Sequence, residues 1–240
     1  MIGALAGCGD NFALRDAPVV DVAAPSIDAI LAIVPDALPP DAALVDASPF
    51  DAAPGVPDLQ FVANQMAGTV VFDRHTFYAD DCEVVEQCVG GAGARLLLRF
   101  DTVTANRGTG DLVVGVPPPD GESNDQFVWS ACHKHHHYNN FIQYQLIDSA
   151  GTVTAARKQA FCLEDGEQVQ IGAVPTGYSC RNQGISRGWA DVYTRYTPCQ
   201  WIDVTGLPSG AYTLHAEVNP LHTLVESSYD NNVFTVAVKL

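Results

Sequence analysis

Residues 129–138 read WSACHKHHHY and contain four of the chain's seven histidines. In an extended strand every second side chain points to the same face of the sheet. His133, His135 and His137 are therefore predicted to share one face, with the residues between them on the other. Three imidazoles from one short strand suit a Cu(II) or Zn(II) ion that keeps coordination positions open for chemistry. The alternative is a polar surface segment that binds metal only adventitiously.

Extended patterns continue on both sides of this stretch, and no long segment has a helical period. Clusters of Gly, Pro, Asn and Asp separate them, as expected for turns. Many short strands with irregular connections predict an all-β fold, with a β-sandwich core and long irregular, disulfide-stapled loops. The longest connections are residues 73–93 and 163–198. The predicted strands are residues 69–72, 94–103, 111–116, 127–137, 141–147, 152–161, 199–204, 211–218 and 233–239.

The charge of the chain is strongly negative and unevenly distributed. The 240 residues carry a formal net charge of -16, and half of it falls in residues 1–60, which hold nine aspartates and one arginine. A phosphate backbone requires a basic surface, so this balance argues against nucleic-acid binding. An acidic surface attracts cationic partners instead, such as amines or lysine-rich proteins.

The first 56 residues differ in character from the rest. Residues 5–8 read LAGC and resemble a bacterial lipobox, so residues 1–8 are interpreted as the remnant of a lipoprotein signal with Cys8 as the lipidated residue. A chance match with a free Cys8 thiol is the alternative. Residues 9–56 are rich in Ala, Pro and Asp and are predicted to be a disordered tether. Residues 57–240 would then be one folded domain.

These features predict an extracytoplasmic location, at a bacterial cell surface or in the periplasm. Seven cysteines are typical of an oxidising compartment. The sequence has no apolar run long enough for a transmembrane helix, so contact with a membrane is expected only through a lipid anchor at Cys8.

Several collinear motifs resemble the lysyl oxidase family. Residues 128–137 (VWSACHKHHH) are similar to the copper-binding segment of that family, and residues 158–165 (KQAFCLED) to the segment around its cofactor lysine. Residues 191–193 (DVY) resemble the segment with its cofactor tyrosine, and residues 199–203 read CQWID as the family does. The likeness covers residues 57–240, and several motifs in order are more specific than any single one.

The resemblance implies a copper-dependent amine oxidase. Copper would bind His133, His135 and His137, and Lys158 and Tyr193 would form the family's lysine tyrosylquinone (LTQ). Primary amines or lysine side chains of proteins would be oxidised by O₂ to aldehydes, with release of ammonia and hydrogen peroxide. The quinone supplies an electrophile and an electron sink, and a general base is also required.

The residues themselves leave other roles open. The chain has only three lysines, at positions 134, 158 and 239, and Lys158 lies in an otherwise apolar-to-neutral strand end. Lys158 as an ordinary strand-end cation and Tyr193 as a core tyrosine are the structural alternatives. Asp191 and Asp203 lie near Tyr193 in sequence, so either is a candidate base, although both also suit turns and caps.

A calcium site is a second implication of the resemblance. Oxygen ligands suit a hard cation that would hold the two ends of the domain together. The alternative is a polar β-turn near residue 230, since Asn and Asp dominate turns. The residues that match the family's calcium ligands are Asp58, Leu59 (through its carbonyl), Glu226, Asn231 and Asn232.

The resemblance also implies disulfides. By position, Cys82–Cys88 and Cys132–Cys180 match family bridges. Cys162 and Cys199 lack their family partners, so they either pair with each other or remain free thiols.

Two further functions compete with an amine oxidase. One is a non-enzymatic module, a surface or adhesion β-sandwich that binds calcium or copper. The other is a zinc hydrolase with three histidine ligands, which lacks an obvious glutamate beside the histidines in sequence. Retention of both Lys158 and Tyr193 favours the oxidase, because neither alternative needs that pair.

Overall fold

The computed structural model describes residues 55–159 and 161–240. The predicted lipobox at residues 1–8, with Cys8, and residues 9–54 of the predicted tether lie outside the described residues. Val56 belongs to the folded unit, because its N–H donates to Thr109 Oγ1 at 3.0 Å and its carbonyl accepts from Thr109 N at 2.8 Å. No helix in the described part of the chain has the length and hydropathy to cross a lipid bilayer.

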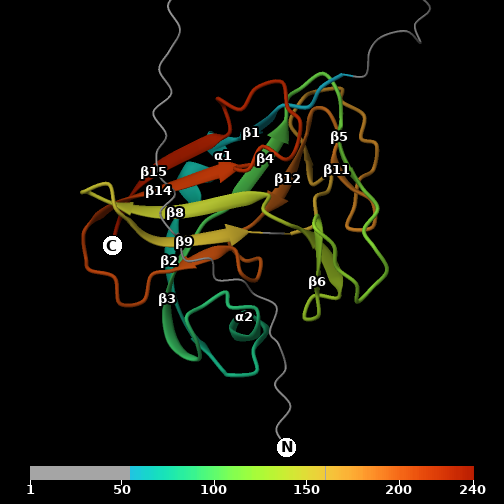
Figure 1. The fold of residues 1–240 in the computed structure, drawn as a ribbon. Helices are drawn as coiled ribbons and strands as arrows, with labels where there is room; N and C mark the ends of the chain where they lie inside the picture. The colour runs from blue at the N-terminus through green and yellow to red at the C-terminus, as the bar shows by residue number, and fades with distance from the viewer. Residues whose placement is uncertain (1–54, 160) are drawn as a thin grey trace, which may run out of the picture. The chain divides into compact units, whose positions relative to one another are not determined.

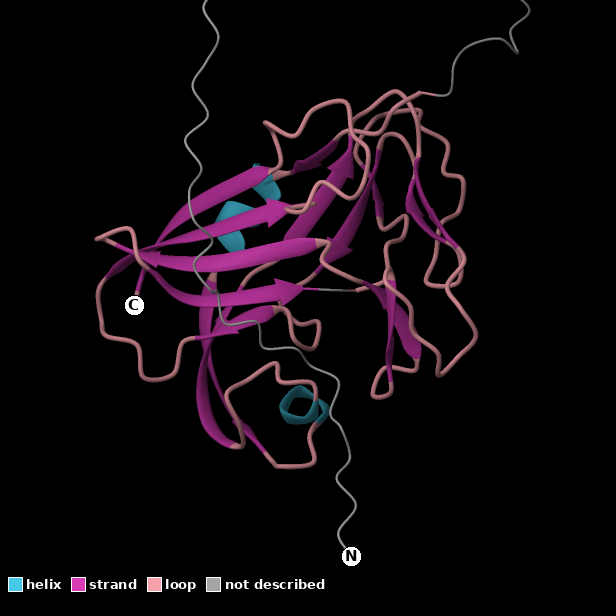
Figure 2. Ribbon diagram, in the orientation of Figure 1, coloured by secondary structure: helices cyan, strands magenta, loops and turns pink. Residues whose placement is uncertain are grey.

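The fold is all-β, as predicted, and its few helical segments are single turns (Figure 2). In chain order the elements are β1 (Leu59–Phe61), α1 (Ala63–Met66), the 3₁₀ turn η1 (Ala67–Thr69), β2 (Val71–Phe77), α2 (Cys82–Val85), β3 (Gly93–Arg99), β4 (Thr102–Asn106), β5 (Leu112–Gly115), β6 (Phe127–Ser130), β7 (His135–Tyr138), β8 (Ile142–Asp148), β9 (Val153–Gln159), β10 (Glu167–Gln168), β11 (Gln183–Ile185), β12 (Trp189–Tyr193), β13 (Trp201–Asp203), β14 (Ala211–Val218) and β15 (Val233–Lys239).

Two four-stranded antiparallel sheets form the predicted sandwich. Their strand orders are β1-β4-β12-β10 and β15-β14-β8-β9, and Figure 1 shows the second sheet as a layer of long strands. Phe61 of the first sheet packs on Phe234 of the second, with ring centroids 6.3 Å apart. Buried apolar residues of both sheets belong to one hydrophobic cluster, and its burial is the main force that holds the layers together.

Alternation of side chains explains why these segments are strands. Along β14, Tyr212, Leu214, Ala216 and Val218 are buried while the residues between them are partly exposed. One face of the strand therefore packs on the core and the other meets solvent. The central strand β4 is buried along its whole length because β1 and β12 flank it.

Three smaller groups of strands complete the domain. Strands β13, β3 and β2 form a third sheet. Phe77, Leu97 and Trp201 of these strands belong to a second apolar cluster. The pairs β6-β7 and β11-β5 lie beside the sandwich (Figure 1). The hairpin β6-β7 carries the histidines, so the sandwich serves as its support.

Two predicted strands are each interrupted in the structure. Residues 127–137 form the hairpin β6-β7 with a turn at residues 131–134, and residues 94–103 form β3 and β4. Strands β10, β11 and β12 lie within residues 163–198, which were predicted to be a long loop. These strands are two to five residues long, too short for a periodic signal to mark them.

The six described cysteines form three disulfides with pairings other than those predicted. The bonds are Cys82–Cys132, Cys88–Cys199 and Cys162–Cys180. The predicted bonds Cys82–Cys88 and Cys132–Cys180 are therefore wrong, and so is the option of a Cys162–Cys199 bond or of free thiols at these positions.

The fold explains why cysteines close in sequence do not pair. Helix α2 separates Cys82 from Cys88 and directs them to different neighbours. Cys88 is buried against Trp201, next to Cys199, whereas Cys82 meets the residue that precedes His133. The two bonds thus attach one short segment to the hairpin on one side and to the second apolar cluster on the other.

A buried polar contact between the sheets provides a test of the packing. The Tyr144 hydroxyl lies 2.7 Å from Thr102 Oγ1 and accepts from Gln200 Nε2 at 3.3 Å. Replacing Tyr144 by Phe leaves these groups with fewer partners and should lower the free energy of unfolding by about 1–2 kcal/mol in urea titrations. Tyr196→Phe, at a 78% exposed position, is the matched control and should change it by less than about 0.5 kcal/mol. Equal effects would contradict this account.

Candidate functional site

The histidines occupy the end of the hairpin β6-β7. His135 and His137 lie on one face of β7, as alternation predicts, but His133 lies in the turn and not in a continuous strand. The turn is closed by a hydrogen bond from Lys134 N to the Ser130 carbonyl at 2.9 Å, and Lys134 has a φ of 60°. This left-handed residue reverses the chain so that His133 faces the other two rings.

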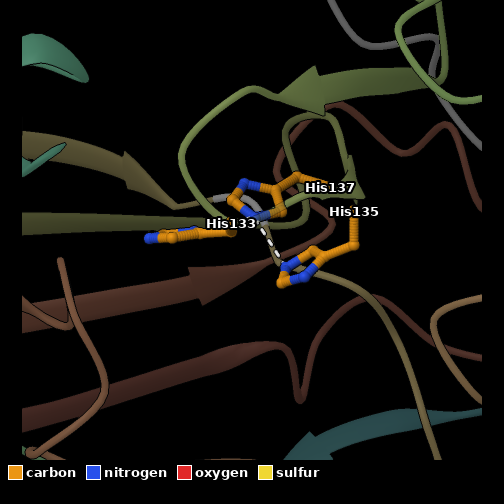
Figure 3. A group of neighbouring side chains, drawn as sticks. All are labelled: His133, His135 and His137. Carbon is orange, nitrogen blue, oxygen red and sulfur yellow. Dashed lines mark hydrogen bonds between the residues drawn. The ribbon is translucent and has the colours of Figure 1, made fainter.

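The three imidazoles converge (Figure 3). His137 Nε2 lies 3.1 Å from His135 Nε2 and 3.4 Å from His133 Nδ1. Two nitrogens bound at about 2.0–2.1 Å to one ion, at angles between square and tetrahedral, are about 2.8–3.4 Å apart. The spacing of the nitrogens therefore fits a single Cu(II) or Zn(II) ion, and imidazole donors suit both.

The surroundings of His135 favour its neutral ring. Burial lowers the pKa of His135, and the neighbouring His133 lowers it further. A neutral imidazole is the form that binds a metal ion. His136 points to the opposite face, where it is buried and its Nε2 lies 2.9 Å from the Glu122 carbonyl. Lys134 is exposed, so neither residue joins the triad.

Glu86, which the sequence did not mark, lies beside the triad. It follows α2, inside the Cys82–Cys88 segment, and its Oε2 is 3.8 Å from His133 Nε2. Its Oε1 accepts a hydrogen bond from Ser130 Oγ at 2.5 Å. The Cys82–Cys132 bond brings this glutamate to the hairpin, so its position could have been predicted only with the correct disulfide pairing.

Phe161 connects the histidines to Tyr193. Its ring centroid lies 5.7 Å from that of His137 and 4.3 Å from that of Tyr193. The Phe161 carbonyl accepts from Tyr138 N at 2.8 Å, which holds this segment against β7. Tyr193, on β12, is buried, and its hydroxyl donates to the Cys162 carbonyl at 2.8 Å.

Lys158 lies near the end of β9, where its backbone pairs with Gln143 of β8. It precedes Phe161 by three residues, and three residues of chain span at most about 11 Å. The backbone of Lys158 is therefore within that distance of the segment whose aromatic ring contacts Tyr193.

The two aspartates proposed as bases have different environments. Asp203 is engaged elsewhere, since it accepts from Gly90 N at 2.9 Å and from Thr205 N at 3.0 Å. Asp191 is on the same strand face as Tyr193 and is 1% exposed. Neither of its carboxylate oxygens has a hydrogen-bond partner among the described residues.

The electrostatics of Asp191 and Tyr193 follow from this burial. Desolvation raises the pKa of Asp191 well above its ordinary value, and the nearby Tyr193 hydroxyl offsets part of the effect. Burial and the Asp191 charge raise the pKa of Tyr193 well above 10. A carboxyl group that holds a proton readily, beside a buried phenol, is a feature of reactive sites.

The residues predicted to hold calcium form a second cluster, where the start of the domain meets residues near its end. The amide groups of Asn231 and Asn232 donate to Asp58 Oδ2 at 3.0 Å and to Glu226 Oε1 at 3.0 Å. Leu59 takes part through its N–H, which donates to Glu226 Oε2 at 2.7 Å. All five predicted residues are thus brought together.

The chemistry of this cluster fits a hard cation. Asn231 Oδ1 and Asn232 Oδ1 are buried and have no hydrogen-bond partner among the described residues. Burial raises the pKa of Glu226, although hydrogen bonds from Asn219 and Asn232 oppose that effect. Unpartnered amide oxygens beside two carboxylates are the donors that Ca²⁺ prefers.

Comparison with known proteins identifies the domain. The family profile described as lysyl oxidase matches residues 57–240. Lysyl oxidase homolog 2 of Homo sapiens is 33% identical over 190 residues, covering 74% of this chain and 24% of that protein. Lysyl oxidase homolog 1 of Homo sapiens is 33% identical over 193 residues, covering 75% of this chain and 32% of that protein. Lysyl oxidase homolog 2 of Gallus gallus is 35% identical over 190 residues. The chain thus corresponds to a quarter to a third of the length of these relatives.

The burial of Asp191 predicts that the free energy of unfolding depends on pH. Because its pKa is raised in the folded state, the folded chain binds more protons than the unfolded chain, and stability falls as the pH rises above about 4. Asp191→Asn removes this effect, so metal-free wild type should lose stability relative to the variant as the pH rises from about 4 toward the raised pKa of Asp191, by up to about 1.4 kcal/mol per pH unit. Urea titrations across this range measure the difference. Asp120→Asn, at an exposed position, is the matched control and should leave the pH dependence of the free energy of unfolding as in wild type. If that free energy changes with pH in the same way in wild type and in Asp191→Asn, the burial of Asp191 has no such effect.

Proposed function

Because the chain belongs to the lysyl oxidase family, we propose that residues 57–240 form a copper-dependent amine oxidase. The observation that carries the proposal is the spatial order His137, Phe161, Tyr193, in which a three-histidine cluster lies one aromatic ring away from a buried tyrosine. Copper is the proposed occupant of His133, His135 and His137. Lys158 and Tyr193 are the proposed source of LTQ.

The two prosthetic parts have separate roles. LTQ supplies an electrophilic carbonyl and an electron sink for the oxidation of a primary amine by O₂ to an aldehyde, with release of ammonia and hydrogen peroxide. Copper held by His133, His135 and His137 would promote the oxidation of Tyr193 by O₂ when the cofactor is made. Tyr193 and Phe161 are buried, so the protein itself keeps bulk water from the ring.

Asp191 is the proposed general base. It is buried beside Tyr193, whereas Asp203 is held by backbone amides away from that residue. A base must lie within hydrogen-bond reach of the proton that it removes, and Asp191 shares the strand face of the reactive tyrosine. Its raised pKa favours uptake of a proton from a substrate carbon.

Primary amines, free or as lysine side chains of proteins, are the proposed substrates. The net charge of -16 attracts cationic molecules at low ionic strength. Three disulfides support an oxidising, extracytoplasmic location. Attachment to a membrane through a lipid at Cys8 is part of this proposal.

We further propose that Ca²⁺ binds the cluster of Asp58, Glu226, Asn231 and Asn232, with Leu59 at its edge. The support is the pair of buried amide oxygens without described partners. A cation there would connect β1 to the segment before β15, so its role would be to stabilise the closed ends of the domain.

The cofactor assignment predicts the effect of two conservative variants. Lys158→Arg and Tyr193→Phe should each abolish quinone absorbance and amine-dependent peroxide release, because neither can form the cross-link. Both should bind Cu(II) as wild type does. Lys239→Arg and Tyr196→Phe are the matched controls and should retain both signals. The measurements are a visible spectrum, an intact mass and a peroxide assay after expression with copper and oxygen.

Other outcomes would redirect the assignment. Peroxide release by Lys158→Arg would show that the proposed lysine is not the cofactor residue. Copper-loaded wild type with unlinked Lys158 and Tyr193 peptides would favour the non-enzymatic metal-binding surface module.

The calcium proposal predicts a concentration-dependent stabilisation. Ca²⁺ at 100 times its dissociation constant should raise the free energy of unfolding of wild type by about 2.7 kcal/mol. Asp58→Asn removes a buried carboxylate and should lose most of this gain, whereas Asp80→Asn, at an exposed position, should retain it. Thermal melts with and without millimolar Ca²⁺ test this prediction, which fails if wild type shows no shift.

A further inference from the structure

Glu86 occupies a position that the proposed copper centre leaves unexplained. Its carboxylate and the His137 ring face different nitrogens of the His133 ring. Nδ1 of His133 faces His137 at 3.4 Å, whereas Nε2 of His133 faces Glu86 Oε2 at 3.8 Å. When one imidazole nitrogen binds a metal ion, the other carries the proton and usually donates it to an acceptor.

We infer that Glu86 is the outer-sphere carboxylate of the metal centre and orients His133 for binding through Nδ1. This inference rests on the proposed function, because it assumes that the three histidines hold a metal ion. Glu86 is not itself a ligand of the cluster. The group of donor atoms around the metal position, all within 4.8 Å of one another, comprises His133, His135 and His137 and does not include Glu86.

Ser130 links the Glu86 side chain to the turn that carries His133. Its hydroxyl donates to Glu86 Oε1 at 2.5 Å and accepts from His133 N at 2.9 Å. One hydroxyl therefore links the carboxylate to the backbone of the histidine that it faces. This arrangement leaves Glu86 Oε2 for His133, either directly after a small ring movement or through a bridging water.

The disulfide Cys82–Cys132 explains how a residue 47 positions away in sequence reaches this place. The bond joins the start of α2 to the residue immediately before His133, and Glu86 is the C-cap of that helix. The side chains of Glu86 and His133 are 23% and 19% exposed. A partly buried carboxylate interacts more strongly with an imidazole N–H than a fully solvated one does.

The position of Glu86 also separates this site from a zinc hydrolase. A hydrolytic glutamate must reach a water molecule bound to the metal ion. Glu86 instead faces Nε2 of His133, whereas the other nitrogen of that ring faces His137. Its geometry suits the positioning of a ligand.

The test compares Glu86→Gln with Glu83→Gln in the full chain. Both substitutions remove one carboxylate from the same segment, but Glu83 has no contact with Ser130 or His133 among the interactions of the described residues. Cu(II) alone is titrated against a competing chelator. Glu86→Gln should bind Cu(II) about 10- to 100-fold more weakly than wild type, the usual cost of losing an outer-sphere partner, and Glu83→Gln should bind within twofold.

Electron paramagnetic resonance of bound Cu(II) provides a readout that a purely structural role would not move. The g and hyperfine values should change in Glu86→Gln and stay unchanged in Glu83→Gln. Ser130→Ala is a second variant, which keeps the carboxylate but removes its support, and it should weaken binding in the same direction. Apo melting temperatures and disulfide masses establish that each variant is folded.

The outcomes separate this inference from the proposed function. Wild-type affinity and spectra in Glu86→Gln would overturn the role of Glu86 and leave the copper centre in place. An equal loss in Glu83→Gln would also overturn it, because the effect would then belong to the charge of the segment. Failure of wild type to bind Cu(II) would overturn both the inference and the proposed metal centre.

Discussion

The turn between β6 and β7 is the constraint on which the site depends. The hydrogen bond from Lys134 N to the Ser130 carbonyl, together with the left-handed backbone at Lys134, reverses the chain within four residues. His133 is thereby turned toward His135 and His137. A continuous strand would have spaced alternate residues about 6–7 Å apart along one line, whereas the turn places three nitrogens around one point.

The remainder of the domain keeps this hairpin in place. The hydrogen bond from Tyr138 N to the Phe161 carbonyl joins β7 to the segment that follows β9. Gln183 Nε2 donates a second hydrogen bond, to the His136 carbonyl of β7, at 2.8 Å. The disulfide Cys82–Cys132 holds the turn from the opposite side. A two-stranded hairpin is marginally stable alone, so these attachments are what allow it to present a preorganised set of ligands.

A second constraint operates at the ends of the domain. Leu59 and Glu226 are 167 residues apart in sequence, and Leu59 N donates to Glu226 Oε2. The contact joins the start of β1 to the segment before β15, and it lies beside buried amide oxygens that have no described hydrogen-bond partner. A buried carboxylate also lies beside Tyr193. Both oxygens of Asp191 are buried there and have no hydrogen-bond partner among the described residues.

The sequence alone determined the all-β class and membership of the lysyl oxidase family. Periodicity is a local property, and so it marked the long strands and the three histidines, whereas the resemblance to a family supplied the roles expected of Lys158, Tyr193 and the calcium candidates. The tertiary structure alone decided the disulfide pairing, the turn at His133 and the neighbours Glu86, Ser130 and Phe161. Those contacts join segments up to 111 residues apart, and packing of the two sheets, which local pattern does not encode, sets which segments meet.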